Sequence, residues 1–166
     1  MAICEGRTVI ITGAGGGLGR AYALAFAEQG ANVVVNDIRR QAAEQVVGEI
    51  LEAGGQAIAN ADDITTVATA QHIVDAALAA FGEVHVLVNN AGILRDRMFI
   101  SLSEEDWDAV MRVHLKGHFC LANILGKRWR DQAKAGQLVD ARIINTSSGA
   151  GLQGSVGQSN YSAAKG

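Results

Sequence analysis

Short apolar runs alternate with longer segments of helical composition along the 166 residues of this chain. The first run is rich in β-branched residues, which is typical of a strand buried in a parallel sheet. Four similar runs follow, and each is separated from the previous one by a segment long enough for a helix or a long loop. The pattern predicts five strands, at residues 7–12, 32–36, 56–61, 84–89 and 141–147.

The segments between these strands predict helices, because they combine strong helix formers with glycines that stop them. Thr65 or Thr66 is suited to cap the third helix, and Ser103 is followed by acidic residues that favour a first turn. The predicted helices cover residues 20–29, 41–53, 65 or 66 to 81, and 103 to about 134, the last either continuous or broken. This alternation favours one α/β domain over residues 1–166, with a parallel sheet covered by helices on both faces.

A glycine-rich turn joins the first strand to the first helix. Gly13, Gly17 and Gly19 follow Thr12 in the pattern Thr-Gly-x-x-x-Gly-x-Gly, whereas G-x-G-x-x-G fails because Leu18 stands at its last position. Backbone N–H groups at a helix start point toward an anion, and missing Cβ atoms let a pyrophosphate approach. No Gly-Lys-Ser/Thr follows, which argues against a P-loop. A merely flexible turn is the alternative interpretation.

The second strand is followed by Asp37, about 20 residues beyond the glycine turn. A carboxylate there is placed to accept hydrogen bonds from the adenosine ribose hydroxyls and to repel a 2′-phosphate. The residue therefore favours NAD over NADP. Arg39 and Arg40 follow at once and keep NADP open, although a solvated helix start also explains them.

Polar or small residues follow every predicted strand. In a parallel sheet with right-handed crossovers, the carboxyl ends of the strands border the ligand cleft. The sequence therefore brings these positions to one cleft: residues 13–19, Asp37, Asp63, residues 89–92 and residues 147–148.

Near the end of the chain, Tyr161 is followed four residues later by Lys165. In a helix this spacing puts both side chains on one face, one turn apart. An ammonium beside a phenol favours the phenolate, which makes the tyrosine a proton donor and acceptor near neutral pH. An ordinary exposed helical face is the alternative.

Composition narrows the classes of function. The net charge is −3 with both signs interspersed, which argues against a nucleic-acid partner. No apolar stretch reaches the length of a membrane span and the first residues lack a signal-peptide pattern, so we expect a soluble, cytoplasmic protein without a membrane partner. Cys4 and Cys120 stand apart and are expected to be reduced thiols.

Taken together, these motifs resemble those of the short-chain dehydrogenase/reductase family in order and spacing. The matching residues are Thr12, Gly13, Gly17, Gly19, Asp63, Asn89-Asn-Ala-Gly92, Ser148, Tyr161 and Lys165. The resemblance implies a Rossmann-type, doubly wound sheet in three α/β/α layers. Residues 89–97 and 113–117 look most like the (3R)-hydroxyacyl-CoA dehydrogenase unit of type 2 multifunctional β-oxidation enzymes, and bacterial 3-oxoacyl reductases share much of both segments.

The family implies a role for each matching residue. Tyr161 would exchange a proton with the substrate oxygen, and Lys165 would favour the ionised phenol and hold the nicotinamide ribose. Ser148 would hydrogen-bond the carbonyl or alkoxide oxygen. Asp63 and Ile64 would contact the adenine. The other cofactor-binding residues would be Thr12, Gly13, Gly17, Leu18, Gly19, Asp37, Asn89, Ala91 and Gly92.

His114 stands where the family usually has an asparagine that helps to hold a water near the lysine. A histidine both donates and accepts, so a catalytic relay through His114 can survive if its tautomer suits. A hydrogen-bonded helix histidine is the alternative. His118 lies four residues further on and suggests a metal pair, but no acidic third ligand has fitting spacing, so we expect no metal.

Family members continue past the lysine with more of that helix, further strands and a substrate-covering loop. We therefore expect a chain truncated at its C-terminal end, either a piece of a longer protein or a fragment that folds with part of its site missing, and an incomplete sheet. An isolated first turn is unfavourable, which predicts a weakly held Lys165. The fifth strand should present an unpaired edge.

The leading functional hypothesis is NAD(H)-dependent interconversion of a secondary alcohol and a ketone, with a 3-hydroxyacyl thioester as the small-molecule substrate. One alternative is an NADPH-dependent reductase of 3-oxoacyl-carrier-protein type, and another is a nucleotide-binding module without catalysis. Apolar faces on the helix from Ser103 and on the helix at Tyr161 suggest subunit packing. The family resemblance points to a homodimer or homotetramer.

Overall fold

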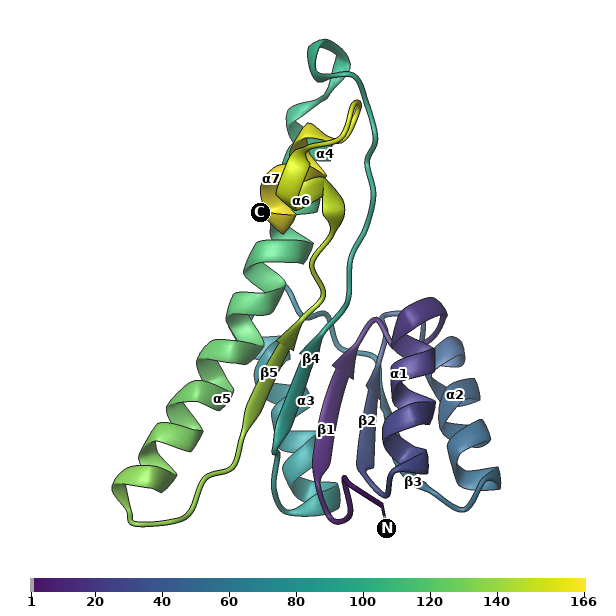
Figure 1. Cartoon of the computed structure of the whole chain (residues 1–166), viewed down its shortest axis with the longest axis vertical. Coiled ribbons are helices and arrows are strands. Elements are labelled where there is room, and N and C mark those ends of the chain that lie inside the picture. Colours follow the sequence, from purple (N-terminus) through teal and green to yellow (C-terminus); the bar gives the residue numbers. More distant parts are fainter. Residues whose placement is uncertain (1) are drawn as a thin grey trace.

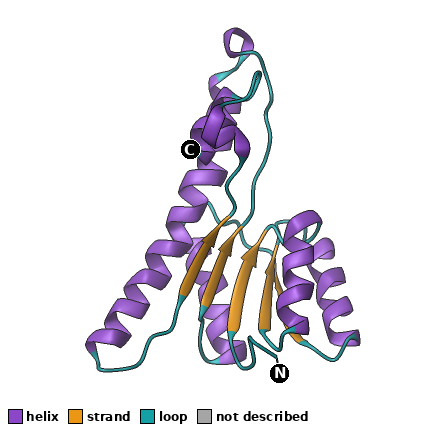
Figure 2. Ribbon diagram, viewed as in Figure 1, coloured by secondary structure: helices purple, strands orange, loops and turns teal. Residues whose placement is uncertain are grey.

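Five parallel strands form one sheet, in the order β3-β2-β1-β4-β5, in this computed structural model, which describes residues 2–166 (Figure 1, Figure 2). The central strand β1 pairs with β2 on one side and β4 on the other, so that Val9 lies opposite both Val33 and Val86. The strands are β1 (Thr8–Thr12), β2 (Asn32–Asn36), β3 (Gln56–Asn60), β4 (Val86–Asn89) and β5 (Arg142–Asn145). The predicted parallel α/β sheet is confirmed.

Helices connect the strands and extend beyond them. Within residues 2–166 the α-helices are α1 (Gly17–Glu28), α2 (Arg40–Glu52), α3 (Val67–Phe81), α4 (Glu104–Met111), α5 (Gly117–Lys134), α6 (Gly149–Gln153) and α7 (Ser159–Lys165). A 3-10 turn covers Phe99–Ser101. The helix predicted from residue 103 to about 134 is broken into α4 and α5 by a π-helical turn at Arg112–Lys116, which we call the wide turn. Of the helices in the part of the chain described, none is long and apolar enough to span a membrane.

Two apolar cores lie on opposite faces of the sheet. Side chains alternate along β1, so Val9 and Ile11 pack against α1 and α2, while Ile10 packs against α3 and α5. All three are completely buried, and burying a side chain of this size stabilises the fold by about 1.5–3 kcal/mol. Figure 1 shows α1 and α2 on one side of the sheet and α3 on the other, the three-layer arrangement that the sequence predicts.

The helix ends follow the predicted signals. The hydroxyl of Thr66 accepts a hydrogen bond from the Thr69 N–H (3.2 Å), so Thr66 rather than Thr65 caps α3. Ser103 caps α4 in the same way by accepting from the Asp106 N–H (3.1 Å). Gly82 ends α3 with a φ of +79°, a left-handed conformation that glycine adopts without a steric penalty.

The fifth strand forms one edge of the sheet, as predicted. β5 is shorter than the segment 141–147 expected to form it, and all four of its residues are exposed. Ile143 and Ile144 are 42% and 45% exposed although they point to opposite faces of the sheet. The described part of the chain therefore leaves both faces of this strand only partly covered.

A small lobe of α4, α6, α7 and the loop after β4 stands beyond the carboxyl ends of β4 and β5 (Figure 1). Two of its segments that are far apart in the sequence pair through their backbones, since the Arg97 N–H donates to the Gly157 carbonyl (2.8 Å). The side chain of Gln158 also donates to the carboxylate of Asp96 (3.0 Å). These contacts place the start of α7 above the sheet edge where the predicted site lies.

Candidate nucleotide-binding and catalytic site

The glycine turn after β1 has the shape of an anion cradle. Gly13 and Gly17 have φ values of +62° and +52°, and α1 begins at Gly17, so Gly17, Leu18 and Gly19 form its first turn. A Cβ on Gly19 would lie 2.2 Å from the carbonyl oxygen of Gly13, which shows how closely the helix approaches the turn. The helix start therefore directs free N–H groups to the carboxyl edge of the sheet, where an anion fits.

Thr12 supports this turn from beneath rather than facing a ligand. It is fully buried, and its hydroxyl accepts hydrogen bonds from the N–H groups of Asn90 and Ala91, both at 3.0 Å. Asn90 returns the contact, because its side-chain amide donates to the carbonyl of Thr12 at 3.1 Å. These hydrogen bonds connect the ends of β1 and β4. Asn90 is thus part of the site, although the sequence indicated it only as a member of the segment 89–92.

The Asp37 carboxylate at the end of β2 is buried and accepts four hydrogen bonds. Two come from backbone N–H groups, of Gly15 (3.0 Å) and Arg39 (2.9 Å). The other two come from the Arg39 guanidinium, at 3.1 Å and 3.2 Å. Burial alone would raise the pKa of Asp37, but these hydrogen bonds outweigh it and hold the pKa below its usual range. Arg39 is therefore paired with the carboxylate, and it also stands at the start of α2 with its side chain 67% exposed, as the interpretation of a solvated helix start expects.

A second polar turn follows β3. Asp63 accepts hydrogen bonds from both the N–H (2.9 Å) and the hydroxyl (2.8 Å) of Thr65. Ile64, between them, is buried against Gly117 at the start of α5. The side chain of Asn36 connects this turn to β2 by donating to the carbonyl of Asp62 (3.0 Å).

One cavity of about 500 Å³ joins the carboxyl ends of four strands. Its lining includes six of the predicted cofactor-binding residues: Gly13, Asp37, Asp63, Ile64, Ala91 and Gly92. Arg39, Arg95 and Arg112 also line it, so the cavity has three cationic groups as well as the carboxylates of Asp37 and Asp63. Asn89 does not reach it, because its side chain is buried and donates to Asn145 on β5 (2.9 Å).

Tyr161, Lys165 and His114 come together beside this cavity. The rings of Tyr161 and His114 meet edge to face with their centroids 5.2 Å apart. The Lys165 ammonium lies 5.9 Å from the centroid of the Tyr161 ring and donates to the carbonyl of Thr146. Lys165 is buried, which lowers the pKa of its ammonium below the usual value. The prediction of a weakly held Lys165 is therefore wrong, because packing of α7 against α4 and α6 supplies what an isolated turn lacks.

His114 lies in the wide turn and links the cavity wall to Tyr161. Its Nε2 is 3.1 Å from the Ile93 nitrogen and 2.9 Å from the Ile93 oxygen, so the tautomer decides which contact is the hydrogen bond. Its Nδ1 is buried and has no hydrogen-bond partner among residues 2–166. Burial lowers the pKa of His114, the Ile93 hydrogen bond opposes that effect, and the nearby charge of Lys165 adds to it. Burial of the ring therefore favours the neutral imidazole.

Two further side chains shape α6 and α7. The Ser148 hydroxyl accepts a hydrogen bond from the Ala150 N–H (3.2 Å) and so caps α6. Asn160 is fully buried, donates to the Arg95 carbonyl (3.1 Å) and accepts from the Tyr161 N–H (2.8 Å). Asn160 thus fixes the start of the helix that carries Tyr161, a role that the sequence pattern did not reveal.

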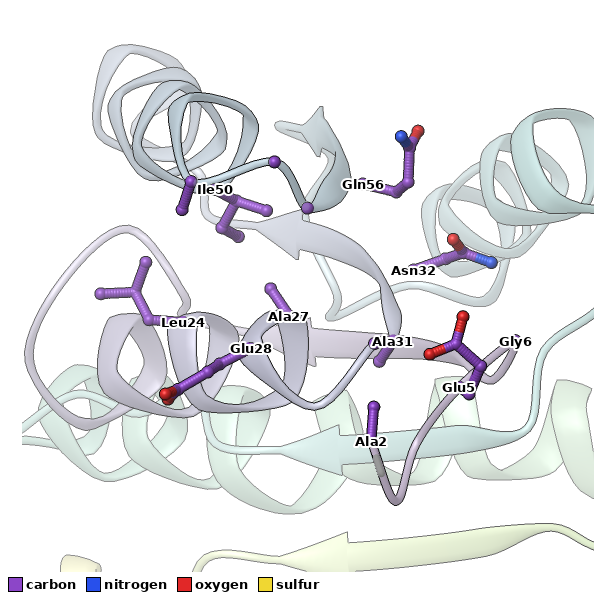
Figure 3. A pocket seen from close by; sticks show the side chains of 14 residues that line it. Ala2, Glu5, Gly6, Leu24, Ala27, Glu28, Ala31, Asn32, Ile50 and Gln56 are labelled. Atoms are coloured by element: carbon purple, nitrogen blue, oxygen red, sulfur yellow. The ribbon is translucent and has the colours of Figure 1, made fainter.

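A larger cavity, of about 760 Å³, lies at the opposite end of the sheet (Figure 3). It is bordered by the ends of α1 and α2 and by the chain before β1, with Leu24, Ala27 and Ile50 as apolar lining and Glu5 and Glu28 as its charged groups. None of the predicted site residues reaches it. The described residues also contain no group of three or more side chains arranged to hold a metal ion.

Comparison with known proteins identifies relatives over nearly the whole chain. The family model for short chain dehydrogenases matches residues 7–166. The hydroxyacyl-CoA dehydrogenase ChsB1 of Mycobacterium tuberculosis is 50% identical, over 97% of this chain and 53% of its own length. The peroxisomal multifunctional enzyme type 2 of Mus musculus is 49% identical, over 97% of this chain and 22% of its own length.

A solved structure gives the same result. The crystal structure of a short chain dehydrogenase from Mycobacterium avium superimposes with a TM-score of 0.96 at 55% identity, over 99% of this chain and 61% of the other. The present chain thus spans about half or less of the curated relatives named above.

Proposed function

The chain belongs to the short-chain dehydrogenase family, and on that premise we propose that it is an oxidoreductase that interconverts a secondary alcohol and a ketone. Members of this family generally bind NAD or NADP. The observation that carries the proposal is the pair of links between the cavity and the catalytic group. His114 contacts both the cavity wall at Ile93 and the ring of Tyr161. Thr146 accepts from Lys165 and donates to Asn90 (3.4 Å).

The cavity fits a dinucleotide on structural grounds. A Cβ on Gly13 would lie 2.8 Å from the Ala91 Cα, so only glycine fits at this point of the cavity wall. The nearby start of α1 would bind a pyrophosphate, and Asp37 in the cavity lining would bind a ribose. The nicotinamide ring supplies hydride exchange when the cofactor is bound. We propose NAD as the cofactor because the buried Asp37 carboxylate would repel a 2′-phosphate.

The residues of the chain would manage the proton. In the direction of alcohol oxidation, the phenolate of Tyr161 takes the hydroxyl proton of the substrate, and in ketone reduction the phenol returns a proton to the same oxygen. The ammonium of Lys165 lies 5.9 Å from the centroid of the Tyr161 ring, so a positive charge stands beside the group that would exchange the proton. Ser148 would donate a hydrogen bond to the substrate oxygen as negative charge develops on it.

We propose a 3-hydroxyacyl thioester as the substrate. Support comes from the hydroxyacyl-CoA dehydrogenase named above, which shares half of its matched residues with this chain. We further propose a homodimer or homotetramer that works in the cytoplasm on a small molecule, without a nucleic-acid or membrane partner.

Replacing Tyr161 by Phe tests the catalytic assignment. The change removes one oxygen from a ring whose position is set by His114 and Asn160, so it should lower kcat by about a thousandfold and leave the Kd for NADH within about twofold. Tyr22→Phe on α1, which lies outside the site, is the matched control and should keep full activity. Retained turnover in Y161F would contradict the assignment. A wild type that binds NADH but turns over no secondary alcohol or ketone would instead support a nucleotide-binding module.

A further inference from the structure

Asn160 stands directly before Tyr161, and its side chain connects three separate segments of the chain. The side chain is fully buried. Its amide nitrogen donates to the carbonyl of Arg95 in the loop after β4 (3.1 Å) and to the carbonyl of Asp106 in α4 (3.4 Å). Its amide oxygen accepts from the N–H of Tyr161 (2.8 Å). One amide group therefore joins the loop, α4 and the first turn of α7.

The short helix α7 depends on this amide at its start. The first N–H groups of a helix have no partner within the helix, and the Tyr161 N–H is one of them, because the first helical bond runs from the Ser162 N–H to the Gln158 carbonyl (2.7 Å). The Asn160 oxygen supplies the missing acceptor while its nitrogen reaches outside the helix. Asparagine suits the position because it donates and accepts at once, whereas an ionised aspartate only accepts.

The loop that receives Asn160 also holds the aromatic neighbour of Tyr161. Two residues before Arg95, the backbone of Ile93 contacts the Nε2 atom of His114, and the His114 ring meets the Tyr161 ring edge to face. Ile93 and Arg95 both line the cavity of about 500 Å³. One short stretch of the cavity wall therefore sets the backbone of Tyr161 through Asn160 and its ring through His114.

We propose that Asn160 is a positioning residue for proton exchange: through the Arg95 and Asp106 carbonyls it holds the phenol of Tyr161 in reach of the substrate oxygen. This inference rests on the proposed function. Without the amide, α7 keeps its packing against α4 and α6, but the start of the helix loses its connection to the cavity wall. A displacement of about 1 Å can lower a rate by about a hundredfold. The loss falls on kcat, because the glycine turn at the start of α1 is not involved.

The experiment compares Asn160→Ala with Ser162→Ala on the full chain. Ser162 is the matched control, because it follows Tyr161 in the same helix and its buried hydroxyl has no hydrogen-bond partner among residues 2–166. In N160A, kcat for ketone reduction should fall by about thirtyfold to a hundredfold, while the Kd for NADH stays within about twofold. Both quantities should stay within about twofold of the wild type in S162A.

Asn160→Asp adds a readout that a merely structural role does not move. The ionised carboxylate cannot donate to the two carbonyls, but the protonated carboxyl has the shape of the amide and one O–H donor. Burial favours the protonated form, so the ratio of kcat in N160D to kcat in the wild type should rise by about fivefold or more from pH 8 to pH 6. The same ratio should stay constant in N160A. Circular dichroism gives the folded fraction at each pH, by which kcat is corrected.

The charged groups around this position are the same in both proteins. The side chains of Arg95 and Asp106 pair with each other (3.6 Å), and His114 and Lys165 lie beside the ring of Tyr161. Their titration affects the wild type and N160D alike and cancels in the ratio.

Fluorine NMR follows the ring of Tyr161 without any turnover. The chain has two tyrosines, so difluorotyrosine in a Tyr22→Phe background labels Tyr161 alone. One narrow resonance is expected with Asn160 in place, and a broadened or second resonance in N160A. An unchanged resonance, a kcat of N160A within about twofold of the wild type, or a ratio for N160D that does not vary with pH would overturn the inference.

Two other outcomes are also decisive. If N160A does not fold, the pH dependence of kcat and of the resonance width in N160D decides in its place. A wild type that turns over no secondary alcohol or ketone would overturn the proposed function, and the fluorine spectra would still show whether Asn160 holds the ring.

Discussion

Gly19, in the first turn of α1, tests whether the close approach of helix and glycine turn is real. A Cβ at this position would lie 2.2 Å from the Gly13 oxygen and 2.7 Å from the side-chain nitrogen of Asn90. Contacts below 3.0 Å are essentially never seen for real Cβ atoms. Gly19→Ala must therefore push the helix and the turn apart by at least 0.8 Å at the oxygen. Gly48, on α2, has no atom within 4 Å of its would-be Cβ and gives a matched control.

The two substitutions should have opposite signs. Alanine favours a helix over glycine by up to about 1 kcal/mol, and G48A should be stabilised by about that amount. G19A gains less from helix propensity, because residue 19 lies in the first turn of α1. It also has an overpacking cost of about 3 kcal/mol. This is the upper end of the usual range, because the backbone oxygen of Gly13 cannot rotate away from the new Cβ. The net expectation is a loss of about 2 kcal/mol in the free energy of unfolding, or a Tm lower by about 4–8 °C.

Urea unfolding followed by circular dichroism measures both variants under the same conditions. G19A should also bind NADH more weakly, because displacing the start of α1 moves the N–H groups that would hold the pyrophosphate. If G19A were as stable as G48A, the steric argument would be refuted, and with it the claim that this turn and helix are held in contact. A loss of stability in both variants would refute the propensity argument instead.

Two further predictions concern buried polar groups. Thr12→Val leaves the N–H groups of Asn90 and Ala91 without their acceptor, and it should lower the free energy of unfolding, measured in urea, by about 2 kcal/mol. Thr8→Val on the same strand should not lower it, because the buried Thr8 hydroxyl has no partner among the described residues. Equal losses in the two variants would contradict this account. Burial lowers the pKa of His118 to about 4. As the pH falls, the unfolded chain therefore binds a proton at His118 before the folded chain does. The free energy of unfolding should decrease between about pH 6.5 and pH 4. Relative to His118→Gln, the wild type should lose about 1–2 kcal/mol of its free energy of unfolding at pH 5. The control His72→Gln changes a side chain that is 64% exposed and should follow the wild type. If the free energy of unfolding of H118Q and of the wild type changed in parallel with pH, the role of His118 would be disproved.

Features decided by local composition were predictable from the sequence. The β-branched runs around residues 8–12 and 32–36 form buried strands because each carries enough apolar surface to fill both faces of a parallel sheet. Gly82 ends α3 through its left-handed backbone, and Ser103 begins α4 through a side-chain hydrogen bond; neither needs a tertiary contact. The position of the site at the carboxyl edge of the sheet then follows from the right-handed crossovers, and six of the candidate cofactor-binding residues line one cavity there.

Features decided by contacts between distant segments were not predictable. The hydrophobic pattern of residues 103–134 does not reveal the wide turn at Arg112–Lys116, because one extra residue in a helix shifts the period too little to see in a short stretch. Asn160 looks like any polar residue until the Arg95 carbonyl lies beside it.

The two parts of the candidate site follow strands that differ greatly in their exposure to solvent. The glycine turn and Asp37 follow β1 and β2, whose residues are almost all buried. Thr146, whose carbonyl accepts a hydrogen bond from the Lys165 ammonium, follows the exposed edge strand β5. Backbone at a sheet margin opens at lower free energy than backbone at its centre, and its amide hydrogens exchange sooner. We therefore expect mild heating to open the backbone around Thr146 before the glycine turn and Asp37. On the function proposed above, turnover would then be lost before dinucleotide binding.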